Sequence, residues 1–345
     1  KLKASYGLVG NDQIGGDRRF IYNETVIGGG KYYFGTTPSQ YTSVRLGEFP
    51  NPNVGWEKAK KFNLGADLSF FNQLNISVDY FKENREGIFL QRKSIPMYVG
   101  LSTKPWVNIG KMRNSGIDAS LEYHQPLGKD LHLTVRGNFT YARNRIMDQD
   151  EPDYAYTYMN HSGQMQWQKF GLVAAGLFQD QEDIDSWAKQ SFGEVKPGDI
   201  KYLDLNGDGI VDNYDTKPIG YSDIPEIVYG FGFSLQWKAF DLSAFFQGVA
   251  HVSFSTLTDQ TQAFVGRNLK ESSVFADLYG NTWTPENPGA KYPRMTTGAI
   301  DNNNQLSTFW MANGRYLRLK NLELGYTLPK RIANKIAMQS LRVYL

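Results

Sequence analysis

The clearest signal along this chain is a strict alternation of apolar and polar positions. Five segments carry it without interruption, at residues 62–70, 74–80, 117–123, 131–141 and 229–237. In the first of them, Phe62 and Leu64 flank Asn63, and the pattern continues to Phe70. A period of two places successive side chains on opposite faces of a strand, so each segment is predicted to be a β-strand. Weaker or shorter strands are predicted at 242–250, 315–328, 2–8 and 341–345.

The connections between these strands have two lengths, which alternate along the chain. Short connections lie at 71–73, 124–130, 238–241 and 329–340, and long ones at 10–55, 82–113, 143–227 and 252–313. Antiparallel strands joined in this way have all short turns at one end and all long loops at the other, which is typical of outer-membrane β-barrels. A phase slip near Lys320 and Asn321 predicts a β-bulge in the strand at 315–328.

Two all-β architectures fit this pattern, an antiparallel transmembrane β-barrel and a soluble β-sandwich. The runs are longer than the roughly 5–6 residues of most sandwich strands and approach the about 9–11 that a tilted membrane strand needs. The outward positions of the five clear runs carry no charge. Aromatic residues cluster beside the short connections, where one membrane interface would lie: Phe70, Phe71, Tyr123, Trp237, Phe240 and Tyr326. The pattern therefore favours the barrel.

Composition mainly excludes function classes. With 41% hydrophobic residues, 21% charged residues and a net charge of +2, the chain is neither a disordered segment nor a basic nucleic-acid binder. It has no cysteine, which excludes disulfides, thiolate metal sites and a cysteine nucleophile. No run of about 18 apolar residues predicts a transmembrane helix. A mean hydropathy of -0.47 is ordinary for a barrel, whose strands average apolar and polar positions.

We find no catalytic constellation and expect no enzyme. The histidines form no HExxH motif, and there is no GxSxG. Six loop tryptophans can either stack on sugar rings or pack within the loops: Trp56, Trp106, Trp167, Trp187, Trp283 and Trp310. Short helices are predicted at Glu182–Lys189 and Lys330–Met338, the second as a small cap on a short turn.

The sharpest local chemistry lies in residues 204–215, which read DLNGDGIVDNYD. Oxygen-bearing side chains stand at loop positions 1, 3, 5, 9 and 12, with Gly209 at position 6, as in an EF-hand calcium loop. The predicted Ca²⁺ ligands are Asp204, Asn206, Asp208, Ile210 through its backbone carbonyl, Asp212 and Asp215. Asp215 replaces the usual Glu and reaches less far, as in the dockerin form of the loop. The alternative is an acidic turn without metal. The flanks do not resemble two long helices, so the expected role is to stiffen a loop.

Several segments resemble the barrel of SusC/RagA-type TonB-dependent transporters. They are KLKASYGLVGNDQIG, PNPNVGWEKAKKFNLGADLSFFNQLNISVDYF, PGDIKYLDLNGDGIVDNYDTKPIG, PEIVYGFGFSLQWKAFDLSAFFQG and NGRYLRLKNLELGYTLPKRI with SLRVYL. The resemblance runs nearly end to end and is weakest at 23–48 and 252–300. It implies that residues 1–345 are a C-terminal portion of a large plugged barrel of about 22 strands, without signal peptide, TonB box, plug domain or closing strands. Such a portion is not expected to fold alone, because its terminal strands would have unpaired edges.

The function implied by the resemblance is active import across the bacterial outer membrane. The family imports oligosaccharides, and in some members peptides. A SusD-like surface lipoprotein closes over the barrel, and the TonB complex pulls on the plug. The long loops, including 143–227 with its calcium-like segment, would form the lid interface and the upper wall of the site. Polar inward positions agree with a hydrated lumen: Asn63, Asp67, Asp79, Glu122, Arg136, Asn138 and Gln236. A secreted Ca²⁺-dependent carbohydrate-binding β-sandwich and a passive porin remain as alternatives.

Overall fold

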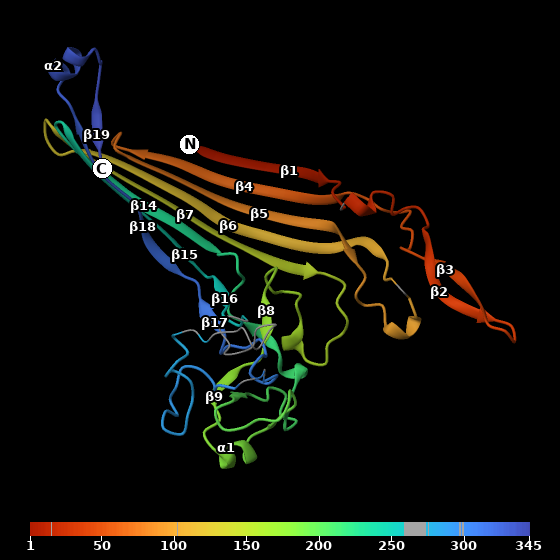
Figure 1. Cartoon of the computed structure of the whole chain (residues 1–345). Helices are drawn as coiled ribbons and strands as arrows, with labels where there is room; N and C mark the ends of the chain where they lie inside the picture. Colours follow the sequence, from red (N-terminus) through yellow and green to blue (C-terminus); the bar gives the residue numbers. More distant parts are fainter. Residues whose placement is uncertain (15, 102, 259–273, 275, 297, 299) are drawn as a thin grey trace. The chain divides into compact units, whose positions relative to one another are not determined.

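The computed structural model describes all residues except 15, 102, 259–273, 275, 297 and 299, and the side chains of 17 and 336 (Figure 1). No helix in the described part is long and apolar enough to cross a membrane. The chain divides into two compact units, which are treated separately below. The first comprises Lys1–Asp153, His161–Gly163 and Leu235–Lys238, and the second Tyr154–Asn160, Gln164–Ser234 and Ala239–Leu345.

The first unit contains five long antiparallel strands. In spatial order they are β1 (Leu2–Asn11), β4 (Glu57–Phe70), β5 (Leu74–Gln91), β6 (Trp106–Pro126) and β7 (Leu131–Asp148). The register aligns the predicted apolar rows, since Leu68 lies opposite Ile76, and Ile76 lies opposite Leu121. The strands are longer than predicted: β5 has 18 residues and β6 has 21. The expected loop at 82–113 is therefore wrong in its bounds, because both strands continue into it.

The second unit contains β14 (Ile227–Trp237, of which the last three residues cluster with the first unit), β15 (Phe240–Ala250), β18 (Tyr316–Thr327) and β19 (Arg342–Tyr344), again neighbours in that order. The predicted bulge is confirmed. Phe245 pairs with Asn321 and Phe246 with Leu319, so Lys320 is the extra residue. Each strand is joined to the next by a short turn or by a long connection with structure of its own.

Large apolar side chains on the long strands remain exposed. Leu64 and Leu68 of β4 are about half exposed, and Leu322 of β18 is 62% exposed. The opposite face of β4 and β5 is polar: the Lys3 ammonium donates to Asp67 at 2.7 Å and lies 3.4 Å from Asp79. A row of exposed apolar side chains backed by a polar face is the arrangement of a membrane-spanning strand, with lipid on one side and a hydrated lumen on the other.

Two long connections of the first unit carry smaller elements. The first holds η1 (Gly16–Arg18) and a hairpin of β2 (Val26–Phe34) and β3 (Ser39–Leu46). The second holds the short η2 (Met97–Val99) between β5 and β6. The short turn between β4 and β5 closes through Gln73 N–H, which donates to Phe70 O at 3.0 Å. Its central residues, Phe71 and Asn72, both have positive φ, which matches the right-handed twist of the strands.

The long connection at 143–227 is folded in its second-unit part. It contains η3 (Thr157–Met159), β8 (Lys169–Gly171), β9 (Ala174–Leu177), α1 (Gln181–Asp185), β10 (Lys189–Gln190), β11 (Ile200–Tyr202), β12 (Ile210–Val211), η4 (Asn213–Asp215) and β13 (Lys217–Ile219). The short strands pair as β8 with β13, β9 with β11, and β10 with β12. α1 begins after Asp180, whose side chain accepts the Asp183 N–H. It ends earlier than predicted, because Lys189 and Gln190 pair with β12 instead.

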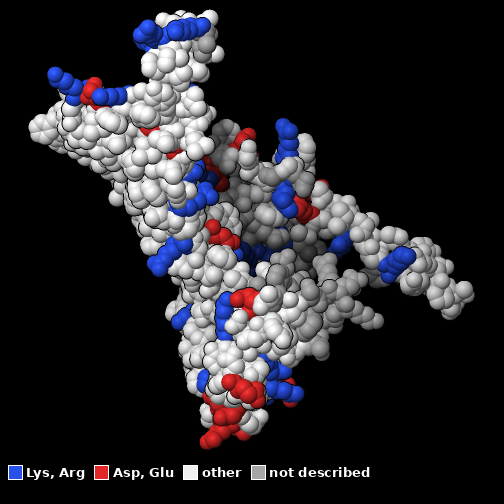
Figure 2. Space-filling model, turned by 60° about the vertical axis from the view of Figure 1, so that its left-hand side comes forward, with Lys and Arg blue, Asp and Glu red and all other residues white. Residues whose placement is uncertain are grey.

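The described part of the connection at 252–313 carries β16 (Ser253–Ser255) and β17 (Met311–Asn313), which pair with each other. Residues 259–273 of this predicted loop lie outside the described residues. The turn between β18 and β19 carries α2 (Lys330–Ala333) followed by η5 (Asn334–Ile336). The predicted helix to Met338 is therefore shorter, because Ala337 adopts the left-handed conformation at φ 56°. Figure 2 shows Lys and Arg gathered over this cap at the top of the view.

Candidate functional site in the folded long connections

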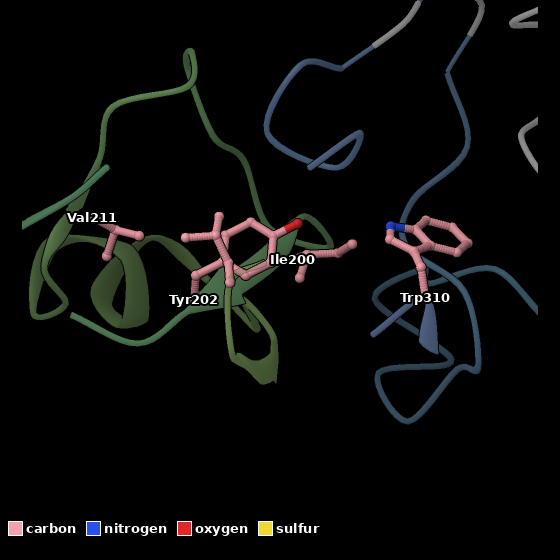
Figure 3. Close-up of a cluster of buried hydrophobic side chains, with 5 residues drawn as sticks. Ile200, Tyr202, Val211 and Trp310 are labelled. Atoms are coloured by element: carbon pink, nitrogen blue, oxygen red, sulfur yellow. The ribbon is translucent and has the colours of Figure 1, made fainter. Parts of the chain in front are cut away.

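The two long connections of the second unit share one hydrophobic core. Its buried members are Leu172, Ile200, Tyr202, Val211 and Trp310, and Figure 3 shows the Tyr202 ring between Val211 and Ile200. Ile200 and Tyr202 stand two residues apart on β11, so the alternation of a strand points both side chains into the core. Trp310 comes from the other connection, just before β17. We call this body, residues 164–226 with the described residues of 252–313, the loop body.

A buried carboxylate holds the two halves of the loop body together. Asp199 is fully buried. Its Oδ2 accepts the Lys196 N–H at 2.8 Å and Arg294 Nη2 at 3.1 Å, and its Oδ1 accepts Asn303 Nδ2 at 2.9 Å. Arg294 Nε lies 2.8 Å from Oδ1 without a well-directed hydrogen bond, so this contact is electrostatic. The carboxylate is thus surrounded by donors from both connections, as a buried charge must be.

Asparagines extend this network along β11. The Ile200 N–H donates to Asn303 Oδ1 at 2.8 Å, and Asn302 Nδ2 donates to Ile200 O at 2.7 Å. Tyr202 donates its hydroxyl hydrogen to Asn302 O at 2.8 Å, and burial raises the pKa of that hydroxyl far above its usual range. Trp310 Nε1 donates to Asn303 O at 2.8 Å. The side chains therefore take the place of a strand neighbour along one edge of β11.

The predicted calcium loop is ordered by its own side chains. Asp204 accepts the Gly207 N–H at 2.6 Å and the Gly209 N–H at 2.8 Å. Asn206 Oδ1 accepts the Asp208 N–H at 2.9 Å, and Asp208 Oδ1 accepts the Ile210 N–H at 2.8 Å. The prediction that Gly209 needs a positive φ is confirmed, with a value of 83°. These bonds fix the first three predicted ligands in one tight turn.

The last predicted ligands form a different structure. Asp215 is fully buried, and its Oδ1 accepts the N–H groups of Leu205 at 2.7 Å and Asn206 at 3.3 Å. Its Oδ2 accepts the Asp212 N–H at 2.8 Å, while Asp212 accepts the Tyr214 N–H at 2.7 Å, which makes a capping box at η4. Three of the roughly four acceptor positions of the Asp215 carboxylate are thus occupied by backbone donors that close the loop.

Only some of the predicted Ca²⁺ ligands of this loop are positioned to bind a metal ion. Ile210, whose carbonyl is the sixth predicted ligand, lies in β12 with its side chain turned outward, while the next residue, Val211, enters the core. Among the residues that the structure describes, no three His, Asp or Glu side chains converge closely enough to hold a metal ion. Asp204, Asn206 and Asp208 offer oxygen atoms in the expected order, but Asp215 is engaged elsewhere. Ca²⁺ binding therefore stays a prediction.

An ion pair on the loop body links α1 to β11. Lys201 donates to Asp183 at 2.6 Å, and its ammonium lies 4.0 Å from the centre of the Trp187 ring. Burial opposes ionisation of Asp183, but the hydrogen bonds from Lys201 and from the Gln179 N–H outweigh it, so the pKa of Asp183 lies below its usual value. Trp187 in turn donates its indole N–H to Tyr202 O at 2.7 Å. The pair therefore stiffens the link between α1 and β11.

The six tryptophans that are candidates for sugar stacking differ in their exposure. Trp283 and Trp310 are buried in the loop body, and Trp187 is half-buried and donates its indole N–H to the backbone of β11. Trp106 is covered by the Arg18 guanidinium at 4.1 Å and stacks on Phe89. Trp56 and Trp167 are more than half exposed and are the members free to meet a ligand.

Comparison with known proteins places these features in context. Residues 22–345 match the family model described as TonB dependent receptor-like, beta-barrel. The chain is 29% identical to TonB-dependent receptor P3 of Formosa agariphila over 358 residues, which is 100% of this chain and 34% of the relative. It is 25% identical to TonB-dependent receptor SusC of Bacteroides thetaiotaomicron over 347 residues, covering 95% of this chain and 31% of the relative.

Solved structures agree with the fold. The RagAB peptide importer in its closed-closed state matches with a TM-score of 0.70 and 24% identity, over 100% of this chain and 36% of that chain. The open-open state of the same importer matches with a TM-score of 0.71 and 23% identity, over 99% of this chain and 35% of that chain. This chain spans about a third of the length of the curated relatives that it matches.

Proposed function

This chain belongs to the TonB-dependent receptor-like β-barrel family, and on that premise we propose that the whole protein imports a solute across the outer membrane with energy supplied through TonB. The strands described above are part of a large antiparallel transmembrane β-barrel in the bacterial outer membrane. The family assignment decides against the soluble carbohydrate-binding β-sandwich that the sequence left open. The passive porin remains the competitor, because it shares the barrel and differs only in how transport is driven.

The proposed cargo is an oligosaccharide or a peptide, carried under a SusD-like surface lipoprotein. The RagAB peptide importer among the similar structures supports a peptide, and the resemblance to SusC/RagA-type transporters implies either class. The observation that carries the proposal is the loop body. Because the two long connections share one core and the Asp199 network, they offer a partner a preformed surface rather than a set of independent loops.

We also propose that residues 204–215 bind Ca²⁺ in this extracellular body. The order of oxygen atoms and the turn that aligns Asp204, Asn206 and Asp208 support this assignment. Asp212 and the Ile210 carbonyl would complete the ligands. Asp215 would act mainly by holding the two ends of the loop together, because backbone donors already occupy most of its acceptor positions. The ion would stiffen the loop body.

Transport is tested in a strain that lacks the gene for the full-length protein. Growth and uptake are measured with oligosaccharides and with peptides as the limiting nutrient, with and without plasmid-borne protein. We expect rescue with one of the two classes, and loss of that rescue when TonB is deleted or the proton gradient is collapsed. Uptake that persists without TonB identifies a passive porin and contradicts the proposal.

The lid is tested with a variant that loosens the loop body. We expect the tagged full-length transporter to co-purify with a SusD-like lipoprotein, and Asp199→Ala to reduce that yield while the barrel remains folded in detergent. Asp277→Ala is the matched control, because the Asp277 carboxylate is exposed and bonds to Lys291 and Tyr292 on the surface of the same body. Equal yields for the two variants would show that the lid does not rest on the loop body.

A further inference from the structure

The turn between β18 and β19 has a chemistry of its own, independent of transport. We call residues 329–340 the basic cap. Its base is closed by Leu328 N–H, which donates to Leu341 O at 2.9 Å, and by the pairing of Thr327 with Arg342. Ala333 is fully buried, so the cap folds back on itself rather than trailing as a free loop. The backbone is therefore a fixed platform for the side chains that it presents.

Those side chains are cationic. Lys330, Arg331 and Lys335 are exposed, and the sequence from 328 to 341 contains no Asp or Glu. Within the described part of the chain none of the three forms an ion pair, and Figure 2 shows blue without red over this region. Arg342, directly beyond the cap, behaves differently because it pairs with both Asp241 and Glu323. Arg342 is therefore neutralised within the fold, whereas Lys330, Arg331 and Lys335 remain available to an external partner.

Apolar groups accompany these cations. Ile332 and Met338 are 49% and 45% exposed on the same cap. At the adjoining strand ends, the rings of Phe240 and Tyr326 lie 4.7 Å apart. Aromatic side chains at strand ends mark the membrane interface of outer-membrane barrels, and short turns lie on the periplasmic side. The cap therefore leaves the strands where headgroups and acyl chains meet.

We propose that the basic cap binds anionic phospholipid headgroups in the periplasmic leaflet of the outer membrane. Lys330, Arg331 and Lys335 would contact the phosphates, and Ile332 and Met338 would enter the boundary below them. A peptide as short as the cap would bind such a surface weakly on its own. The two strands hold it at the interface, so its effective concentration there is high and weak contacts suffice. An acidic protein is the other class of partner with matching charge, but it would leave the exposed apolar pair without a role.

The test uses the full-length transporter in nanodiscs of phosphatidylcholine, with or without phosphatidylglycerol. A polarity-sensitive fluorophore is attached at Met338→Cys, and its quenching by aqueous iodide is measured. We expect quenching to fall and emission to shift to the blue only in phosphatidylglycerol discs, and salt to reverse both changes. The triple variant K330Q/R331Q/K335Q should weaken association of the cap on the order of 100-fold, and therefore lose the shielding.

The matched control is K31Q/R45Q/K189Q, which removes three exposed cations from the long connections and should keep the shielding. The proposal is overturned if iodide quenches the label equally in both lipid compositions. It is also overturned if the triple cap variant is shielded as well as the parent. Shielding that appears only after an acidic periplasmic protein is added would assign the cap to a protein partner instead.

Discussion

Replacing Asp199 by Asn should destabilise the loop body by about 3 kcal/mol. The buried carboxylate receives donors from Lys196, Asn303 and Arg294. Asn keeps the shape but removes the charge, and its NH₂ group must face a donor where an acceptor stood. Removing one partner of a buried ion pair costs about 3–5 kcal/mol, and the lower figure applies because the Arg294 side chain keeps 22% of its exposure and can recover some water.

Amide hydrogen exchange on the full-length protein in detergent measures this change locally. The Ile200 N–H is the best reporter, since it donates to Asn303, the same side chain that contacts Asp199. A loss of about 3 kcal/mol should speed its exchange on the order of 100-fold if the loop body opens as a unit. Asp277→Asn serves as the control. Its contacts with Lys291 and Tyr292 are exposed to solvent, so exchange at Ile200 should stay close to that of the parent.

Two results would refute this reasoning. Exchange at Ile200 in the Asp199→Asn variant that matches the Asp277→Asn control would mean that the buried charge contributes nothing to stability. The second result concerns the pair itself. If Asp199 and Arg294 act together, the double variant D199N/R294Q should cost less than the sum of the two single variants. If the losses of the two single variants simply add in the double variant, Asp199 and Arg294 do not interact, and the carboxylate acts through its other donors alone.

Three further changes address other features of the loop body. Asp204→Ala with Asp208→Ala should abolish any Ca²⁺-dependent rise in the unfolding temperature of the whole protein, and a chelator should reproduce the loss in the parent; unchanged unfolding in both cases means a metal-free turn. Gly198→Ala should cost about 1–3 kcal/mol by hydrogen exchange, because Gly198 has φ 88° and an added Cβ would meet the Trp283 ring at 2.4 Å. The folded pKa of Asp183 lies below its unfolded value of 3.8, so its contribution is complete above that pH and disappears as pH falls through the folded pKa. The stability difference between the parent and Asp183→Asn should therefore shrink from neutral pH to pH 3 or below, and a constant difference would contradict the assignment.

The sequence identified the strands where they cross the membrane and missed their extensions. In β4 the alternation starts at Phe62, but pairing with β1 begins at Glu57 and pairing with β5 at Lys58. Beyond the bilayer neither face of a strand meets lipid, so the apolar rows end while the backbone ladder continues. Charged cross-strand contacts replace them: Arg85 pairs with Glu57 at 2.7 Å, and Lys61 lies 3.3 Å from Glu83. A search for apolar alternation cannot detect such pairs, because they obey charge complementarity instead.

The site was predictable only where its residues are close in sequence. Gly209 and the turn at Asp204 follow from local backbone requirements, and both were found as expected. Asp199 and Asn303 stand 104 positions apart, and nothing in the residues around either one indicates the other. The same holds for Trp310, which had been considered for ligand stacking and instead fills the core. Side chains that join two long connections carry no periodic pattern, so only the folded structure reveals them.

Asp215 separates the two explanations of the acidic loop, because each makes the opposite demand on its length. If residue 215 is the calcium ligand at loop position 12, where Glu is usual, Asp215→Glu should raise the affinity for Ca²⁺. As a buried acceptor of three backbone N–H groups, the side chain is already the right length, and one extra methylene would displace the carboxylate from donors at Leu205 and Asp212. We expect the second effect to dominate, with a loss of about 1–3 kcal/mol in hydrogen-exchange stability whether or not Ca²⁺ is present. Asp215→Asn is the control, since it keeps the length and removes the charge. Tighter Ca²⁺ binding by Asp215→Glu, without loss of stability, would show that this residue serves the metal rather than the turn.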